Sequence, residues 1–187
     1  MDIRLETMFD NPIIASVKRS EDIPKCVRSN ASLSFLLFGN LLEIASPIER
    51  IKSSGKTVIV PIDMVDGLST HDAAADYIVK CTAADGIIST KPGILRYAKT
   101  LGLLTVQRFF LLDSRAMDNM IRQIDNPCVD IIEVVPGAIP KMLKKVVEVS
   151  SKPVIAGGCM LDKEDILAAL NAGAAAVSTS NSALWDL

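Results

Sequence analysis

Histidine is nearly absent from this chain: it occurs once, as His71, and no Cys-x-x-Cys pair is present among the four widely spaced cysteines. Tetrahedral zinc sites need three or four nitrogen and sulfur ligands, so the composition excludes such a site and predicts no bound metal. A disulfide framework is equally unsupported, and we expect reduced cysteines, mostly buried as small hydrophobic residues. These are Cys26, Cys81, Cys128 and Cys159.

Aromatic residues make up only 4% of the chain, and the net charge is −2 at pH 7. That balance lacks the basic surface and the stacking platform of a general nucleic-acid binder. The charge is nevertheless uneven. Segment 91–152 holds ten basic and six acidic residues, so it carries +4 and the remainder carries −6. We interpret the excess either as ordinary solvated helix faces, which we favour, or as an anion-binding face.

Long hydrophobic runs are absent too. Apolar runs such as 33–38 and 131–135 are far shorter than the roughly 20 residues that span a bilayer, which predicts no transmembrane helix and no membrane partner. Residues 1–11 mix charged and apolar side chains, unlike a signal peptide, so we expect a cytoplasmic protein. The 187 residues, 49% hydrophobic and 22% charged, predict one packed domain over residues 1–187.

Short β-rich apolar runs alternate with helical patterns along the chain, at intervals of roughly 23 residues. This repeat has the length of one strand, one short helix and two loops, and it predicts parallel strands joined by right-handed crossovers. Most runs are apolar on both faces, as expected for strands that are buried on both sides. The predicted strands are 13–17, 33–38, 57–62, 86–89, 103–110, 129–135, 153–156 and 174–178.

Helix-starting residues stand between these runs. Asp113 and Asp162 precede amphipathic segments and are predicted N-caps. Pro92 opens another helix at its first turn, where its missing N–H is tolerated. Thr70 is the predicted N-cap of the helix that begins at His71.

Eight β/α units in a chain of this length predict an α/β fold, a compact (β/α)8 barrel of the TIM type with short loops. The last helix, which begins near Ser182, is truncated, and Trp185 is expected to pack it against the barrel. An open, doubly wound parallel sheet is the competing architecture. We favour the barrel because eight units without a long insertion suit closure of the sheet.

Polar residues collect where the predicted strands end, which in a parallel barrel is the functional face. Asp63 follows the third strand, and Thr90 and Lys91 follow the fourth. We predict that all three contact a small polar ligand. For Lys91 the role of phosphate counter-ion is favoured over that of a Schiff-base lysine.

Three polar residues, Gln107, Arg108 and Glu133, lie inside apolar strands and are placed at the same face. An unpaired charge among such apolar neighbours costs several kcal/mol. Arg108 and Glu133, on neighbouring strands, therefore form either a structural ion pair or a direct ligand contact. The sequence supports the two interpretations equally.

The last two strands are followed by the most specific signal. Gly157 and Gly158 follow the seventh strand, and Thr179, Ser180 and Asn181 follow the eighth. Glycine lets the backbone approach an anion closely, and N–H groups at a helix N-terminus attract it. A Gly-Gly pair alone is more often only a turn, but Thr-Ser-Asn one unit later makes it typical of the phosphate site of many barrels.

Several runs together resemble one bacterial family. They are Ile-Asp-Met-Val-Asp-Gly at 62–67, Gly-Ile-Ile-Ser-Thr-Lys at 86–91, Gln-Arg-Phe-Phe-Leu-Leu-Asp at 107–113, Ile-Glu-Val-Val-Pro-Gly at 132–137, Ala-Gly-Gly at 156–158 and Thr-Ser-Asn at 179–181. Over residues 12–185 the chain resembles the glycerol-3-phosphate-responsive antiterminators, which regulate glycerol-uptake operons. Lys91 stands where we expect an arginine in that family.

The resemblance implies a non-enzymatic barrel, without a cofactor, that senses glycerol 3-phosphate and then acts on the leader region of messenger RNA to prevent termination. The predicted phosphate loops fit such a ligand independently. For the RNA contact, the basic segment 91–152 indicates Lys141, Lys144 and Lys145, which lie on a predicted helix flank. The oligomeric state stays open, homo-oligomers included.

A phosphate-binding barrel enzyme is the alternative function. Glu133 and Asp63 would then be the acid and base of a lyase or isomerase that acts on a small phosphorylated metabolite, with Arg108 or Lys91 stabilising an enolate. A structural or partner-binding barrel is a third class. The fold alone does not choose between a sensor and an enzyme.

Overall fold

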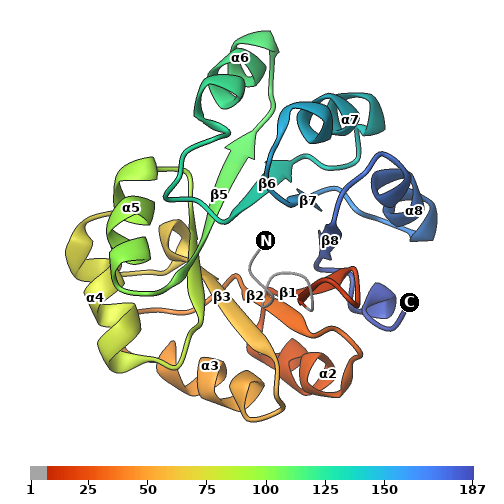
Figure 1. Cartoon of the computed structure of the whole chain (residues 1–187). Helices are drawn as coiled ribbons and strands as arrows, with labels where there is room; N and C mark the ends of the chain where they lie inside the picture. Colours follow the sequence, from red (N-terminus) through yellow and green to blue (C-terminus); the bar gives the residue numbers. More distant parts are fainter. Residues whose placement is uncertain (1–7) are drawn as a thin grey trace.

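The computed structural model describes residues 8–187, in which eight parallel strands form a closed barrel in sequence order. Figure 1 shows the strands around a common centre with the helices outside them. Strand β8 pairs with β1, with Val177 beside Ile13, and this pairing closes the sheet. The predicted barrel is confirmed and the open sheet is wrong. The strands are β1 (Ile13–Val17), β2 (Leu33–Leu36), β3 (Thr57–Pro61), β4 (Gly86–Ser89), β5 (Leu104–Phe110), β6 (Ile131–Val135), β7 (Val154–Gly157) and β8 (Ala176–Thr179).

Strands β1 and β4 have the predicted bounds, and the others differ from the prediction by one or two residues at one or both ends. Strand β2 ends at Leu36, but the apolar run in the sequence continues to residue 38. The predicted strand 33–38 is therefore two residues too long. Two shifts concern the candidate site. Gly157 and Thr179, predicted to lie in loops, are the last residues of β7 and β8.

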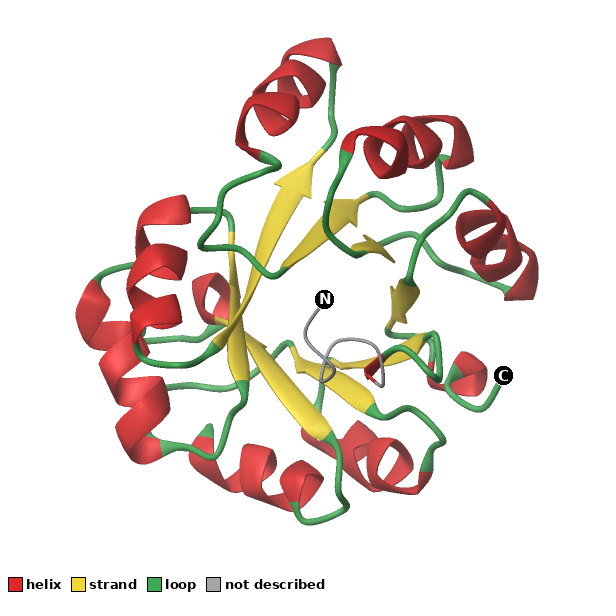
Figure 2. Ribbon diagram, in the orientation of Figure 1, coloured by secondary structure: helices red, strands yellow, loops and turns green. Residues whose placement is uncertain are grey.

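The helices alternate with the strands and surround them (Figure 2). The chain ends in a short 3-10 helix, η3 (Ser182–Leu184), which confirms the truncated last unit. Trp185 follows it, is fully buried, and donates its indole N–H to the Thr179 carbonyl oxygen at 2.8 Å. The α-helices are α2 (Ile23–Arg28), α3 (Ala45–Lys52), α4 (Asp72–Cys81), α5 (Pro92–Thr100), α6 (Ser114–Gln123), α7 (Pro140–Val149) and α8 (Lys163–Asn171).

Two of the predicted caps are confirmed. Asp113 accepts a hydrogen bond from the N–H of Ala116 at 2.8 Å, and Asp162 accepts one from Asp165 at 3.0 Å. The predicted cap of α4 is wrong. His71, without a capping side-chain bond, occupies that position, because the Thr70 hydroxyl lies one residue early.

Replacing Asp162 with alanine is expected to lower the free energy of unfolding by about 1 kcal/mol, because the first turn of α8 loses an acceptor for its N–H groups. For a chain of this size the melting temperature should fall by roughly 2–4 °C. Asp162→Asn, which keeps an acceptor oxygen, is the control in thermal unfolding. Equal melting temperatures for the alanine variant and the wild type would contradict the cap.

The strands are apolar on both faces because the molecule has two cores. One fills the barrel, and the other lies between the barrel and its helices, where Val60 and Val134 are members. Inward and outward side chains alternate along each strand, so one residue of a strand enters the first core and the next enters the second. The barrel core consists of Met8, Ile14, Leu33, Phe35, Ile59, Ile88, Val106, Ile131, Ile155 and Ala176.

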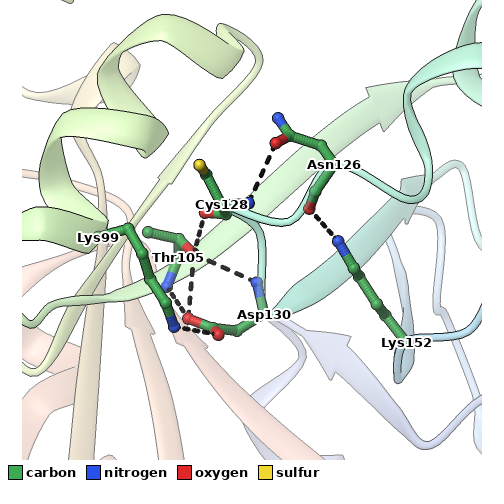
Figure 3. Close-up of polar contacts among 6 residues, drawn as sticks. All are labelled: Lys99, Thr105, Asn126, Cys128, Asp130 and Lys152. Atoms are coloured by element: carbon green, nitrogen blue, oxygen red, sulfur yellow. Dashed lines mark hydrogen bonds and ion pairs between the residues drawn. The ribbon is translucent and has the colours of Figure 1, made fainter.

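The amino ends of β5, β6 and β7 are tied by a polar network (Figure 3). Asp130 pairs with Lys99 and accepts hydrogen bonds from the N–H and hydroxyl of Thr105, both at 3.0 Å. Lys152 donates to the carbonyl oxygen of Asn126, and burial lowers the pKa of its ammonium. Two lysines of the basic segment 91–152 are therefore engaged at the amino-end face, away from the strand ends predicted to be functional.

The expectation of mostly buried cysteines is wrong. Only Cys26 is fully buried, and burial raises the pKa of its thiol, which keeps it protonated and unreactive. Cys81 is the last residue of α4 and Cys159 lies in the loop after β7, and both are exposed, while Cys128 is half-buried. Within residues 8–187 no helix is long and apolar enough to cross a membrane.

Candidate ligand-binding site

The carboxyl ends of the strands form a mouth with two cavities that share one wall. The first, here called the β7–β8 cavity, has a volume of about 270 Å³. The second, here called the β3–β4 cavity, has a volume of about 700 Å³. Met64, Arg108 and Phe110 line both cavities and form the wall between them. A depression of about 580 Å³ at the opposite end of the barrel is lined by none of the predicted site residues.

Arg108 and Glu133 form an ion pair at the floor of the mouth. They are register partners on β5 and β6, and Arg108 Nε lies 2.7 Å from Glu133 Oε2. The Ser178 hydroxyl donates to the other carboxylate oxygen at 3.1 Å. The exposed fractions are 2% for the Glu133 side chain and 13% for that of Arg108. The carboxylate is thus enclosed, and the guanidinium still reaches the mouth.

Glycine at position 157 is required by this pair. A Cβ there would lie 2.6 Å from Glu133 Oε1 and 2.7 Å from the Ser178 hydroxyl oxygen, closer than such atoms approach. The absence of a side chain at Gly157 therefore leaves room for the Glu133 carboxylate and the Ser178 hydroxyl. Gly157 lines neither cavity. The sequence predicted a ligand contact at this position, because a strand-end glycine pair does not show which glycine faces outward.

The last two loops converge on the β7–β8 cavity. Gly158, Thr179 and Ser180 line it. Gly158 has φ of +73°, a left-handed conformation that favours glycine. Among the described residues, no acceptor takes the backbone N–H of Gly158 or Ser180. These two groups are therefore able to donate to a ligand.

Asn181 has a structural place behind these loops. Its side-chain oxygen accepts from the N–H of Ala183 at 3.2 Å, which caps η3, and its amide donates to the Leu161 carbonyl oxygen at 3.0 Å. Asn181 thus connects the loops after β7 and β8 and does not line the cavity. The sequence showed its proximity to the loops but not the direction of its side chain.

The predicted residues from β3 and β4 lie in the other cavity. Asp63 accepts hydrogen bonds from the Ser89 hydroxyl and from the backbone N–H of Thr90, each at 3.0 Å. Lys91 Nζ donates to the Thr70 hydroxyl at 2.8 Å. Asp63, Thr90 and Lys91 line the β3–β4 cavity, and the shared wall separates them from the predicted phosphate loops.

Sequence analysis missed Ser16, which lines the β7–β8 cavity and points inward one position before β1 ends. Lys18, directly after β1, and Ser178, one position before β8 ends, also line this cavity and belong to the polar residues that collect at the strand ends. A serine at an inward position of an apolar strand was the available signal. Gln107 was placed at this face wrongly: it is fully buried on the outer side of β5, where it donates to Gln123 on α6 at 3.2 Å.

The three lysines predicted to contact RNA lie on α7, outside the barrel. Lys141, Lys144 and Lys145 are all exposed. Among the described residues, none of them forms an ion pair with a carboxylate. Their charge is therefore available to a partner.

These features define the class of the protein: a TIM barrel with a small cavity at the carboxyl ends of its strands, lined by both polar and apolar side chains. A family model described as glycerol-3-phosphate responsive antiterminator matches residues 13–185. The chain belongs to this family of transcriptional regulators.

Solved structures and a curated relative agree with this assignment. The glycerol uptake operon antiterminator regulatory protein of Listeria monocytogenes strain 4b F2365 is 31% identical with a TM-score of 0.89, covering 94% of this chain and 95% of that one. A glycerol uptake operon antiterminator-related protein of Thermotoga maritima MSB8 is 36% identical with a TM-score of 0.82, covering 92% and 96%. The uncharacterized protein YgcP of Escherichia coli K12 is 36% identical over 183 residues, 98% of this chain and 96% of that protein.

Proposed function

We propose that this protein is a cytoplasmic sensor of glycerol 3-phosphate that binds the messenger RNA leader of glycerol-utilisation operons when the ligand is bound. Membership of the antiterminator family supports the regulatory role. The observation that carries the ligand is the β7–β8 cavity, where two free backbone N–H groups and Arg108 surround a space suited to a small phosphate ester.

The phosphate group of the ligand is assigned to the N–H groups of Gly158 and Ser180. Backbone donors at a glycine loop and at the start of a terminal helix suit an anion. The glycerol end then points toward the floor, where Arg108, Glu133 and Ser178 offer donors and acceptors. Thr179 also lines the cavity.

Thermal unfolding with added small metabolites tests this assignment. A ligand at 100 times its dissociation constant adds about 2.7 kcal/mol to the free energy of unfolding. The melting temperature should then rise by roughly 5–10 °C with glycerol 3-phosphate. Glycerol at the same concentration, which lacks the phosphate, should leave it unchanged. No shift with glycerol 3-phosphate at millimolar concentration would refute the proposed ligand.

RNA binding is assigned to Lys141, Lys144 and Lys145, because they are exposed and without ion pairs among the described residues. Reversing all three to glutamate should lower RNA affinity and leave glycerol 3-phosphate binding intact. Contacts to phosphates also weaken with salt. The logarithm of the binding constant should fall with the logarithm of the salt concentration, with a slope of about −0.7 for each neutralised phosphate of single-stranded RNA. Titration of labelled leader RNA at several salt concentrations, with and without glycerol 3-phosphate, measures both effects.

A matched control reverses three exposed basic residues on the other half of the barrel, Arg28, Arg50 and Lys80. The control has the same change in net charge, so it separates a local contact from general repulsion. Equal loss of RNA affinity in both triple variants would contradict a binding face on α7. An RNA affinity that changes neither with salt concentration nor with added glycerol 3-phosphate would contradict the proposed regulation.

The enzyme alternative receives no support from the positions of its two carboxylates. Glu133 is held by Arg108 and Ser178, and Asp63 is held by Ser89 and the backbone of Thr90. Both carboxylates are already engaged by groups of the protein itself. We therefore propose a sensor without catalytic activity. Turnover of a phosphorylated metabolite at rates above about 1 per second would overturn that proposal.

A further inference from the structure

The β3–β4 cavity stays unexplained when glycerol 3-phosphate occupies the β7–β8 cavity. It is the larger of the two and opens at the same mouth. Its lining combines apolar side chains, such as those of Met64 and Phe110, with the polar residues Ser69, Thr70, Thr90 and Lys91. Hydroxyl groups and an ammonium around one cavity are the donors that bind a phosphate or carboxylate group.

The charges of this cavity favour an anion. Lys91 is exposed, its ammonium donates only to the neutral Thr70 hydroxyl, and it forms no ion pair within residues 8–187. The nearby carboxylate of Asp63 is already bound by the Ser89 hydroxyl and the Thr90 N–H. Helix α5 begins at Pro92 and has no acidic residue in its own first turn, so no carboxylate of the helix itself repels an anion there.

The wall between the cavities is able to change. Met64 and Phe110 are 46% and 48% exposed, so either side chain can rotate without leaving a buried core. Glu133 binds only Nε of Arg108, and the contact of Nη1 is the Met64 sulfur at 3.5 Å, a weak acceptor. An anionic oxygen in either cavity is a better partner for the outer guanidinium nitrogens.

We propose that the β3–β4 cavity is a second anion subsite, and that the whole mouth accepts small polyols with an anionic group at each end, such as sugar bisphosphates. One phosphate binds at Gly158 and Ser180. The other binds at Lys91, Thr70 and Thr90, with Arg108 between them. This inference rests on the proposed phosphate position in the β7–β8 cavity.

Matched pairs of ligands test the subsite. We choose fructose 6-phosphate with fructose 1,6-bisphosphate, and ribulose 5-phosphate with ribulose 1,5-bisphosphate, each titrated by calorimetry against the full chain. In at least one pair the bisphosphate should bind at least about tenfold more tightly than its monophosphate. Equal affinities within both pairs, or no binding of either bisphosphate, would overturn the proposal.

A variant of Lys91 tests whether this residue provides the tighter binding of the bisphosphate. Lys91→Gln should bring the affinity ratio of the tighter pair close to one, and it should leave glycerol 3-phosphate affinity within about twofold of wild type. Lys144→Gln, which removes the same charge from α7, should leave the ratio unchanged. An unchanged ratio of bisphosphate to monophosphate affinity in Lys91→Gln would overturn the subsite, even if the variant is less stable than wild type.

The two proposals fail in different ways. If glycerol 3-phosphate does not bind, the proposed function is wrong, and so is the inference. If glycerol 3-phosphate binds and Lys91→Gln lowers its affinity as much as that of a bisphosphate, the two cavities form one site for a single phosphate. The second subsite alone is then refuted.

Discussion

Replacing Arg108 with methionine is expected to lower the free energy of unfolding by about 3–5 kcal/mol in the absence of ligand. The change leaves the Glu133 carboxylate 2% exposed and with only the Ser178 hydroxyl as a partner. A buried charge without its counter-charge is the costly half of a broken ion pair. Thermal or urea unfolding measures the loss, which corresponds to a fall of roughly 6–20 °C in melting temperature.

The reciprocal change should cost less. Glu133→Gln leaves Arg108 without its carboxylate, but the guanidinium already reaches the mouth and can turn toward water. We expect a loss of about 1.5 kcal/mol, the net value of one hydrogen bond to a charged group. Equal losses for the two variants would show that the carboxylate is less enclosed than the structure indicates. If both variants also bind glycerol 3-phosphate normally, the pair is purely structural and the ligand contact is refuted.

Gly158→Val is expected to reduce glycerol 3-phosphate affinity by more than about tenfold. The new side chain adds bulk to the wall of the β7–β8 cavity, at the residue whose N–H is assigned to the phosphate. Each hydrogen bond to a charged group contributes about 1.5–3 kcal/mol. The variant also strains the backbone, because φ is +73° and a Cβ would lie 2.9 Å from Val135 Cγ1. Calorimetric titration of the folded variant separates lost binding from lost stability.

Gly55→Val is the control for that strain. Gly55 has φ of +83°, and a Cβ there meets nothing within 4 Å, at the opposite end of the barrel from the mouth. The control should lose stability for the same backbone reason and keep full ligand affinity. Undiminished glycerol 3-phosphate binding in Gly158→Val would remove the last two loops from the site.

Local chemistry along the sequence was enough to determine the barrel and its closure. Each strand is an apolar run, and caps such as Asp113 and Asp162 act within four residues of themselves, so both are readable without tertiary information. Regular repetition of the units then implies parallel strands, and eight of them suit a closed barrel. The six sequence runs that resemble the glycerol-3-phosphate-responsive antiterminators also identified the family correctly.

Only the tertiary structure decided which strand-end residues meet. Asp63, Thr90 and Lys91 were predicted in one set with Gly158 and Ser180, yet the curvature of the barrel and the Arg108 wall put them in separate cavities.

Side-chain direction also came from the fold. Gln107 and Arg108 are adjacent polar residues in the sequence, and the register of β5 turns the first toward α6 and the second into the mouth. Likewise Gly157 and Asn181 are absent from the lining of both cavities, because the sequence gives the order of residues along a loop and not the direction each one faces. Direction depends on strand phase and on packing against other segments, and both arise only when the barrel closes.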